Sequence, residues 1–475
     1  MLEARDFDVV VLGGGIAGYT AAIRASQLGM RAAIIERDKL GGTCLHRGCI
    51  PSKSLLRSAE VLAEMRNGEE YGICAEGISI RYDKVTERKN RIVEQLHRGL
   101  QFMMKKHRIE VIEGIGRIIG PSIFSPRSGA VALELPNGEA ETILPKHLII
   151  ATGSRPRILP GLESDGQVVL TSDDALAMQE LPRSIIILGG GVIGVEWASM
   201  LNDFGVEVTV VEAADRIVPG EDADISQAIA RSLSGRGVRI MTGARLLADR
   251  VRVSDDRVAI TVDKDGNLHD LAADKLLVCV GRRANVEDIG LENTDIALDK
   301  GCIKVNEFMQ TTEKHIYAVG DVNGVLQLAH AAARQGVIAV EHLAGKDPYP
   351  FDAKFVPRCI YGRPEAASLG WTEQEAKERG FDVKIGRFPF SALGKALVLG
   401  EHDGFVKVVA DRRTNDILGV HMFGPRVTDL ISEAALAQLL DATPWEVGQL
   451  IHPHPTLSEA LGEAMLGVDG LSLSI

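Results

Sequence analysis

Two cysteines and the residues around them form the part of this sequence best suited to redox chemistry. Cys44 and Cys49 lie five positions apart in a segment, 41–53, that also holds glycines, a proline and a lysine. Continued as an α-helix, two such positions would be about 7.5 Å apart along the axis and about 140° apart around it. A disulfide needs Cα atoms within about 7 Å of each other. If the two cysteines bridge, the backbone between them must leave the regular helix, and Gly48 allows it to do so.

Two other interpretations of this cysteine pair are less favourable. A zinc site needs a second short-spaced cysteine pair or histidines at matching spacing, so no metal site is predicted. Two buried structural thiols would not need glycines between and around them. We therefore predict a redox-active dithiol. The remaining cysteines are scattered singly, at Cys74, Cys279, Cys302 and Cys359.

A dinucleotide-binding pattern occurs twice in the chain. An apolar run, a G-x-G-x-x-G turn, a helical stretch and a second apolar run are followed by an acid, Glu36 in the first copy and Glu212 in the second. The glycines permit a tight turn against a pyrophosphate at a helix N-terminus, and the acid can hold a ribose hydroxyl. Two such sites suit an enzyme that passes electrons between bound dinucleotides. The offset between the copies is 176 positions throughout, and the glycines are Gly13, Gly15 and Gly18, then Gly189, Gly191 and Gly194.

The two copies are expected to bind different cofactors. The first lies a few residues before the dithiol, and a flavin can accept electrons from a thiolate and pass them on as hydride. The second ends in Glu212, which favours a free ribose 2′-hydroxyl and repels a 2′-phosphate. NAD is therefore predicted over NADP. Arg216 is close enough in sequence to act as a phosphate partner, but we expect it on the far side of the following loop.

Glycine turns recur downstream of each copy. An apolar strand runs into Gly153 after the first copy and into Gly281 after the second. Further along, 314–319 predicts a strand that ends in Gly-Asp. From the local pattern alone, Asp321 is equally a ligand for a ribityl hydroxyl and an ordinary turn aspartate. The helix predicted over 328–343 could direct its N-terminal dipole at a developing negative charge.

A second chemical signal lies near the end of the chain. His452 and His454 alternate with prolines, and Glu459 follows five positions after the second histidine. The prolines restrict the backbone, and the His-Pro bonds are candidates for cis geometry. The pattern resembles an oriented imidazole–carboxylate dyad. It predicts a catalytic histidine without saying which of the two it is.

Composition narrows the class of protein. The 475 residues predict several domains, and the net charge of −12 disfavours nonspecific nucleic-acid binding. No apolar run is long enough to span a membrane, and the first strand begins too early for a signal peptide to precede it. Six cysteines in so long a chain are not a secreted disulfide framework, so a reducing cytoplasm is expected.

Together these motifs resemble the flavin-dependent pyridine nucleotide–disulfide oxidoreductases, over essentially the whole chain. The most specific are the dithiol segment, the doubled nucleotide fold, the Ala-Val-Gly-Asp run at 318–321 and the His-Pro-Thr run at 454–456. Within the family, the chain is most similar to enzymes that oxidise dihydrolipoamide. The resemblance implies an α/β fold with two Rossmann-like domains and a C-terminal α+β dimerisation domain. The implied boundaries are 1–152 for FAD, 153–281 for NAD, 282–350 for a central domain that completes the FAD site, and 351–475 for the interface domain.

The resemblance also implies a role for each motif residue. Cys44 would be the thiol that meets substrate, and Cys49 the thiol beside the flavin. His454 would be the base, oriented by Glu459 and supplied by the other subunit of a homodimer. Lys53 would pair with Glu196 near the flavin. FAD would be bound by Gly13, Gly15, Gly18, Glu36, Lys53, Gly153, Asp321 and Ala329, and NAD by Gly189, Gly191, Gly194, Glu212 and Gly281.

The implied reaction is oxidation of dihydrolipoamide by NAD⁺, with the lipoyl group carried by an acyltransferase or a glycine-cleavage lipoyl protein. A glutathione-reductase-like enzyme would carry arginines where Glu212 stands, and a mercuric-reductase-like enzyme an extra C-terminal cysteine pair. A scaffold subunit with a vestigial site is a further alternative, against which the intact dithiol and dyad argue. One departure from many relatives is His46-Arg47, which replaces a neutral pair and adds positive potential beside Cys44.

Overall fold

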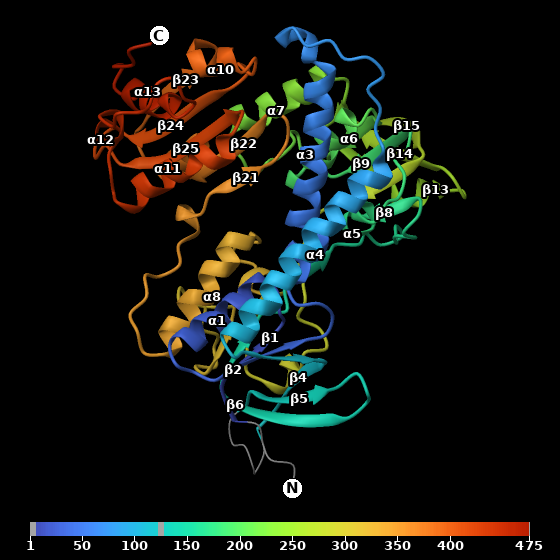
Figure 1. Ribbon diagram of the computed structural model, residues 1–475, viewed down its shortest axis with the longest axis vertical. Helices are drawn as coiled ribbons and strands as arrows, with labels where there is room; N and C mark the ends of the chain where they lie inside the picture. Colours follow the sequence, from blue (N-terminus) through green and yellow to red (C-terminus); the bar gives the residue numbers. More distant parts are fainter. Residues whose placement is uncertain (1–5, 122–127, 475) are drawn as a thin grey trace. The chain divides into compact units, whose positions relative to one another are not determined.

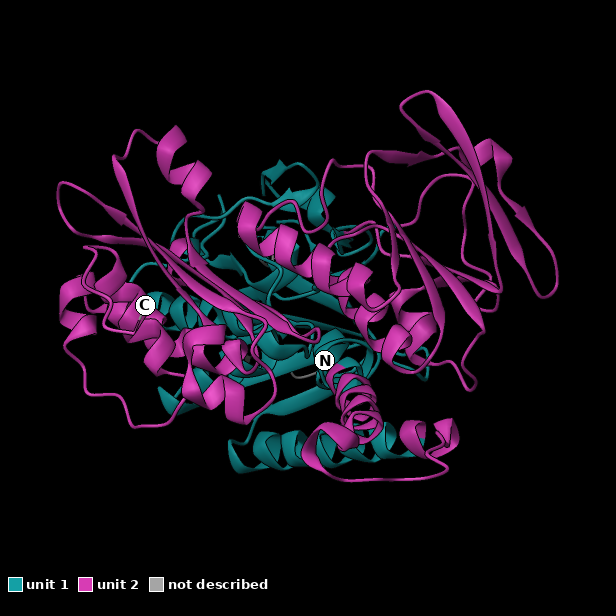
Figure 2. Ribbon diagram, turned by 90° about the horizontal axis from the view of Figure 1, so that it is seen from above, with its two compact units in different colours: residues 1–52, 87–157, 282–353 teal, residues 53–86, 158–281, 354–475 magenta. Residues whose placement is uncertain are grey.

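The computed structural model describes residues 6–121 and 128–474, which divide into two compact units (Figures 1 and 2). The first unit is formed by the segments 1–52, 87–157 and 282–353, and the second by 53–86, 158–281 and 354–475. Among the described residues, no helix is both long and apolar enough to cross a membrane. The four-domain division expected from the sequence remains a prediction.

The first unit is built on a parallel sheet with the order β3-β2-β1-β6 and β20 beside β6. Strand β1 carries Val9, Val10 and Val11, all fully buried, as expected where helices cover both faces of a parallel sheet. Helices α1 and α8 pack closely, since a Cβ on Gly336 would lie 2.6 Å from the carbonyl oxygen of Ala17. The elements are β1 (Asp6–Leu12), α1 (Ile16–Gln27), β2 (Ala32–Glu36), α2 (Gly42–Arg47), β3 (Glu110–Glu113), β6 (Ala140–Ile150), β20 (Ile316–Ala318) and α8 (Ala329–Leu343).

Shorter elements extend this unit. The antiparallel strands β4 (Ile115–Ile119) and β5 (Ala130–Glu134) continue the sheet from β6, and β7 (Ser154–Pro156) pairs with β17 (Arg282–Ala284). Strands β18 (Leu298–Asp299) and β19 (Cys302–Ile303) form a second small pair. The long helices α3 (Cys49–Arg66) and α4 (Tyr82–Lys106) each include residues of both units, because residues 53–86 belong to the second unit.

The second unit begins with a second parallel sheet of order β11-β10-β9-β16-β8. Its apolar strands again read as near-continuous hydrophobic runs, and an antiparallel sheet of β12, β13, β14 and β15 follows in the chain. The elements are β8 (Val169–Thr171), α5 (Ser172–Leu176), β9 (Ser184–Leu188), α6 (Val192–Asp203), β10 (Glu207–Val211), α7 (Ala223–Gly235), β11 (Arg239–Met241), β12 (Ala244–Leu246), β13 (Arg252–Val253), β14 (Val258–Lys264), β15 (Asn267–Ala273) and β16 (Lys275–Val278).

The C-terminal part of the second unit is an antiparallel sheet of order β21-β22-β25-β24-β23 with helices packed on it. The mixture of strands and helices that the resemblance implies for this part of the chain is present. The elements are β21 (Arg358–Ile360), β22 (Glu365–Gly370), α9 (Glu373–Glu378), β23 (Val383–Pro389), α10 (Gly394–Val398), β24 (Phe405–Asp411), β25 (Ile417–Gly424), α11 (Val427–Leu439), α12 (Pro444–Gly448) and α13 (Glu459–Gly467).

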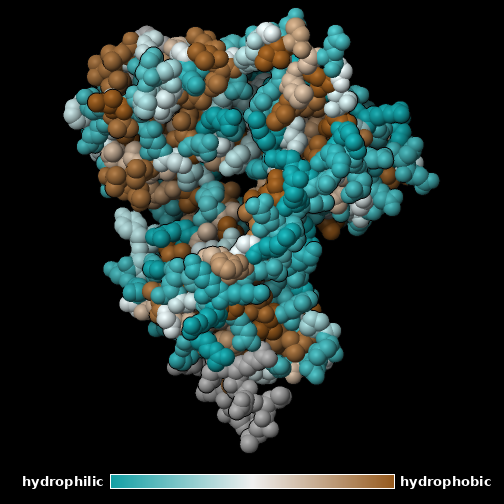
Figure 3. Space-filling view, viewed as in Figure 1, coloured by the Kyte–Doolittle hydropathy of each residue, from teal (hydrophilic) through white to brown (hydrophobic). Residues whose placement is uncertain are grey.

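Large apolar side chains gather on the surface of this C-terminal part (Figure 3). Ile451 is 92% exposed and Leu473 is 85% exposed. An exposed patch of this kind on a folded domain marks an interaction surface. The other exposed apolar residues here are Leu397, Val398, Leu436, Leu439, Leu440, Trp445, Leu450 and Leu471.

Candidate active site

The backbone between the two cysteines breaks where the sequence predicts. Helix α2 ends at Arg47, α3 begins at Cys49, and Gly48 between them has φ −148° and ψ −116°, which is not helical. A Cβ on Gly48 would lie 3.2 Å from the Cα of Cys44, closer than nearly all real Cβ contacts. Glycine at this position therefore lets the start of α3 approach Cys44.

Tyr19 of α1 interacts electrostatically with both cysteines. Burial raises the pKa of the Tyr19 phenol, and negative charge on Cys44 and on Cys49 raises it further. Both cysteines therefore act electrostatically on the same phenol, and both are half-buried. This is the arrangement expected of a dithiol that a substrate can reach.

His46 and Arg47 contribute less positive potential at the dithiol than their types suggest. Burial lowers the pKa of His46, whose Nε2 lies 3.0 Å from the carbonyl oxygen of Leu40. Arg47 forms an ion pair with Asp38. The positive potential expected from this pair is therefore reduced, because burial favours the uncharged imidazole of His46 and Asp38 pairs with the guanidinium of Arg47.

The first glycine turn lies directly against the dithiol segment. Gly13 has φ +106°, and a Cβ on Gly18 would lie 1.9 Å from its carbonyl oxygen, so neither position admits a side chain. The Glu36 carboxylate accepts a 2.6 Å hydrogen bond from the N–H of Gly14. A Cβ on Gly42 would lie 2.7 Å from the Cα of Gly15. The first glycine turn therefore contacts the start of the dithiol segment.

The second glycine turn repeats the same geometry. Gly189 also has φ +106°, and a Cβ on Gly194 would again lie 1.9 Å from its carbonyl oxygen. Glu212 accepts a 2.6 Å hydrogen bond from the N–H of Gly190. Among the described residues other than its chain neighbours, none has an atom within 4 Å of a Cβ built on Gly191, the residue before α6. This open space at a helix N-terminus fits the pyrophosphate of a dinucleotide.

Asp321 is held in a polar network. It follows β20, and its carboxylate accepts a hydrogen bond of 2.5 Å from the hydroxyl of Ser154. Arg282 donates to the same hydroxyl at 2.7 Å and lies 3.9 Å from the Asp321 carboxylate. An ordinary turn aspartate needs no such partners. Of the other predicted ligands, Gly153 and Gly281 both have positive φ and open space beside them, and Ala329 is the first residue of α8.

Lys53 and Glu196 form the predicted pair. The Lys53 Nζ lies 2.8 Å and 3.0 Å from the two carboxylate oxygens of Glu196, a residue of α6. Tyr361 completes the group, because its N–H donates to Glu196 at 3.0 Å and the Lys53 Nζ lies 4.6 Å from its ring centroid. Sequence reasoning missed Tyr361, since nothing in its local pattern links it to residues 165 positions away.

The two histidines near the C-terminus differ in how far their side chains are buried. The side chain of His454 is 77% exposed, and its Nδ1 lies 2.8 Å from the Glu459 carboxylate. The side chain of His452 is 8% exposed and pairs with Glu433 at 2.8 Å. The His454-Pro455 bond is cis, one of the two His-Pro bonds proposed as candidates. Of the two imidazoles, that of His454 is the one exposed at the surface.

The Glu459 carboxylate is suited to orient His454. Burial raises its pKa, but hydrogen bonds from the N–H of Thr456 and from His454 outweigh that effect, and the resulting pKa lies below the ordinary value. Glu459 therefore stays ionised at neutral pH. With Nδ1 held by this carboxylate, Nε2 is the ring nitrogen left for proton transfer.

Two of the other cysteines, Cys279 and Cys359, lack the features of reactive thiols. Burial raises the pKa of Cys279 to about 12. Burial, with the charge of Glu365, raises that of Cys359 to about 11. Because the thiolate is the reactive form, these residues are inert at neutral pH.

Comparison with known proteins assigns the family. Residues 7–336 match the model of the pyridine nucleotide-disulphide oxidoreductases, and residues 356–465 match their dimerisation domain. The chain belongs to this family. A dihydrolipoyl dehydrogenase of Bacillus subtilis is 60% identical over 471 residues, covering 99% of each chain, and one of Zymomonas mobilis is 43% identical over 472 residues, also covering 99% of each.

Two solved structures are similar to this chain over nearly its whole length. LpdA from Mycobacterium tuberculosis has a TM-score of 0.89 at 29% identity, covering 96% of this chain and 98% of that one. The HOCl-induced flavoprotein disulfide reductase RclA from Escherichia coli has a TM-score of 0.84 at 28% identity, covering 97% and 99%. The α/β fold class expected from the sequence is confirmed, and the chain is an oxidoreductase that uses FAD and NAD. The matched dimerisation domain, which carries exposed apolar residues, supports a homodimer.

Proposed function

We propose that this chain is a dihydrolipoyl dehydrogenase, which oxidises protein-bound dihydrolipoamide to lipoamide and reduces NAD⁺. The observation that carries the proposal is the helix break at Gly48, which lies between the two cysteines and close to the Cα of Cys44, in a segment that contacts the first glycine turn. The names of its relatives at 60% and 43% identity support the choice of substrate.

The thiol chemistry is carried by the dithiol and the dyad. His454 takes a proton from one thiol of dihydrolipoamide, and the resulting thiolate attacks the Sγ of Cys44 in an oxidised Cys44–Cys49 bridge. That bridge breaks, Cys49 leaves as a thiolate, and a mixed disulfide forms on Cys44. The second substrate sulfur displaces Cys44 and closes the disulfide of lipoamide, so the electron pair now resides on the reduced dithiol. Glu459 orients the imidazole and stabilises its protonated form.

The two glycine turns hold the cofactors. Bound FAD supplies a carrier that links a dithiol to a hydride acceptor. The positive charge of Lys53 is balanced by the buried carboxylate of Glu196. We assign this ion pair to the binding of the flavin. The FAD ligands are Gly13, Gly15, Gly18, Glu36, Gly153, Asp321 and Ala329, and the NAD ligands are Gly189, Gly191, Gly194, Glu212 and Gly281.

The partners follow from the substrate. In the homodimer, His454 of one subunit serves the dithiol of the other, which agrees with its exposure and its place in the dimerisation domain. The lipoyl group is carried by the acyltransferase of a 2-oxoacid dehydrogenase complex or by a glycine-cleavage lipoyl protein. A cytoplasmic location is proposed from the use of cysteine.

The proposed function is tested by measuring which nucleotide and which sulfur substrate the enzyme uses. With dihydrolipoamide, kcat/KM for NAD⁺ is expected to exceed that for NADP⁺ by at least about tenfold, because Glu212 stands where a 2′-phosphate would lie. Initial rates of NADH and NADPH formation measure this ratio. Oxidised glutathione with NADPH serves as the control substrate pair and is expected to support no comparable rate. Equal use of the two nucleotides would contradict the assignment of Glu212, and a flavin-loaded protein with no dihydrolipoamide turnover would favour a scaffold.

A further inference from the structure

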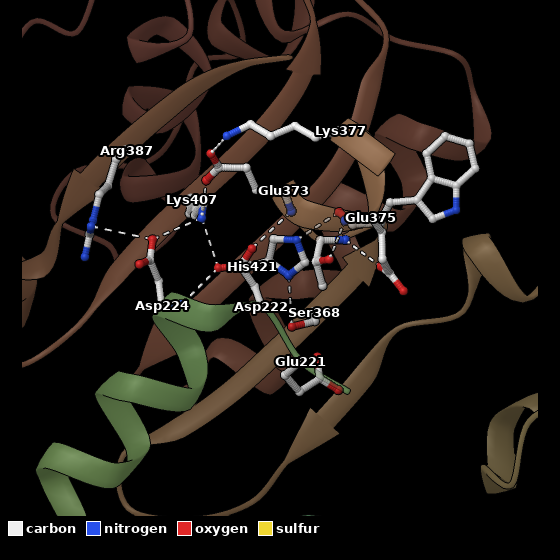
Figure 4. Close-up of polar contacts among 12 residues, drawn as sticks. Glu221, Asp222, Asp224, Ser368, Glu373, Glu375, Lys377, Arg387, Lys407 and His421 are labelled. Atoms are coloured by element: carbon white, nitrogen blue, oxygen red, sulfur yellow. Dashed lines mark hydrogen bonds and ion pairs between the residues drawn. The ribbon is translucent and has the colours of Figure 1, made fainter. Parts of the chain in front are cut away.

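A buried lysine in the dimerisation domain contacts three carboxylates. Lys407 lies in the middle of β24 with its side chain 5% exposed, and its Nζ is 2.9 Å from Asp222, 3.0 Å from Asp224 and 2.8 Å from Glu373 (Figure 4). The side chain of Asp222 is 2% exposed. Burying charges costs free energy unless they are paired, and a sheet interior needs none. The cluster therefore calls for an explanation beyond packing.

Of these carboxylates, Asp222 ends the loop that follows β10, Asp224 lies in α7 and Glu373 lies in α9. Residues 212–222 connect β10 to α7, and Asp222 caps α7 through the N–H of Asp224 at 3.0 Å. The preceding residue, Glu221, pairs with Arg358 of β21 at 3.1 Å and 3.3 Å. Two consecutive acids at the end of this loop are thus held by two cations of the dimerisation domain.

The middle of the loop is tied to the glycine turn. The N–H of Val218 donates to the carbonyl oxygen of Gly190 at 2.8 Å, and a Cβ on Gly190 would lie 2.8 Å from Ile217. Val218 has φ +39°, which is strained for a β-branched residue. Such strain persists only where the surroundings over-determine it. The carbonyl oxygens of Gly190 and Ile217 accept hydrogen bonds from Val218 and Ser226, and the ion pairs to Arg358 and Lys407 hold the end of the same loop.

The same loop keeps Arg216 occupied. Its guanidinium donates to the carbonyl oxygens of Pro219 at 2.8 Å and Glu221 at 2.9 Å. Both acceptors precede Asp222 in the held part of the loop. A loop released from Lys407 and Arg358 would lose these fixed acceptors and free a cation four positions after Glu212.

We propose that Lys407 and Arg358 are positioning residues for the nicotinamide nucleotide. By holding Asp222 and Glu221, they keep the loop 212–222 against Gly190 and keep Arg216 hydrogen-bonded. This arrangement sets both the affinity for NAD and the preference for a free ribose 2′-hydroxyl. The proposal rests on the assignment of the second glycine turn to NAD under the proposed function.

The test compares nucleotide affinity in variants of the flavin-loaded dimer. Arg358→Met removes one cation, and the double variant K407M/D222N removes the other while keeping an asparagine cap on α7. Each is expected to raise the dissociation constant of NADH by at least about fivefold and to lower the preference for NADH over NADPH by at least about threefold. Binding is followed by titration against protein fluorescence. Arg358→Lys, which keeps the charge, is expected to restore much of the affinity.

Controls separate this role from a structural one. Arg363→Met breaks an ion pair to Asp203 at the other end of α6, away from the loop, and is expected to lower the melting temperature without changing NADH affinity. Loop variants whose NADH affinity stays within twofold of the parent would overturn the proposal. If the double variant does not fold, Arg358→Met and Arg358→Lys decide it alone. Glu212→Ala identifies the site: unchanged NADH affinity there would instead reject the assignment of this turn to NAD.

Discussion

Cys44→Ser is expected to lower NAD⁺-linked oxidation of dihydrolipoamide by at least about a thousandfold while the protein keeps its flavin. A serine hydroxyl cannot form the mixed disulfide through which thiol exchange proceeds, so no alternative route replaces the lost sulfur. FAD is expected to remain bound, because the contacts that form the first glycine turn and hold Glu36 are made by other residues. Initial rates and the flavin absorbance of the purified protein measure the two effects.

Cys74→Ser is the matched control for that variant, because it removes an exposed thiol that is not part of the dithiol segment 41–53. It is expected to leave turnover unchanged. Retention of more than a tenth of the parent rate by Cys44→Ser would show that the dithiol is not the route taken by the electrons.

His454→Gln is expected to slow the thiol half-reaction by about 10²–10⁴-fold, the usual effect of losing a general base. Oxidation of the pre-reduced protein by NAD⁺ should change far less, because no substrate thiol is deprotonated in that half. Stopped-flow measurement of each half-reaction separates the two. The loss should therefore fall almost wholly on the step with dihydrolipoamide.

His452→Gln tests the choice between the two histidines. His452 is buried and paired with Glu433, so its replacement is expected to affect stability more than the thiol step. If His452→Gln alone reproduced the slow thiol half-reaction, the base would have been assigned to the wrong residue.

The features that the sequence predicted well depend on neighbours in the chain. Gly13 and Gly189 adopt the same φ because each must turn between a buried strand and a helix, and a side chain at Gly18 or Gly194 would collide with that turn. The break at Gly48 follows from helix geometry and the separation of two cysteines. These are local steric rules, which a short stretch of sequence is enough to express.

The features that it could not predict depend on partners distant in the chain. Lys407 lies 185 positions from Asp222, and Ser154 lies 167 positions from Asp321. In the sequence Lys407 is one cation in an apolar strand, and Asp321 is a turn residue as plausibly as a ligand. His452 is buried because it packs against Glu433 of α11 and Gly462 of α13, and the local sequence does not distinguish it from the exposed His454.

The central claim is that dihydrolipoamide opens a bridge between Cys44 and Cys49. Thiol labelling with iodoacetamide at pH 8, mapped by mass spectrometry before and after anaerobic addition of dihydrolipoamide, tests it directly. Labels are expected at Cys44 and Cys49 only after addition, while Cys279 and Cys359 stay unlabelled because burial raises their pKa values to about 12 and about 11. Labelling of Cys44 and Cys49 to the same extent before and after dihydrolipoamide would contradict the account.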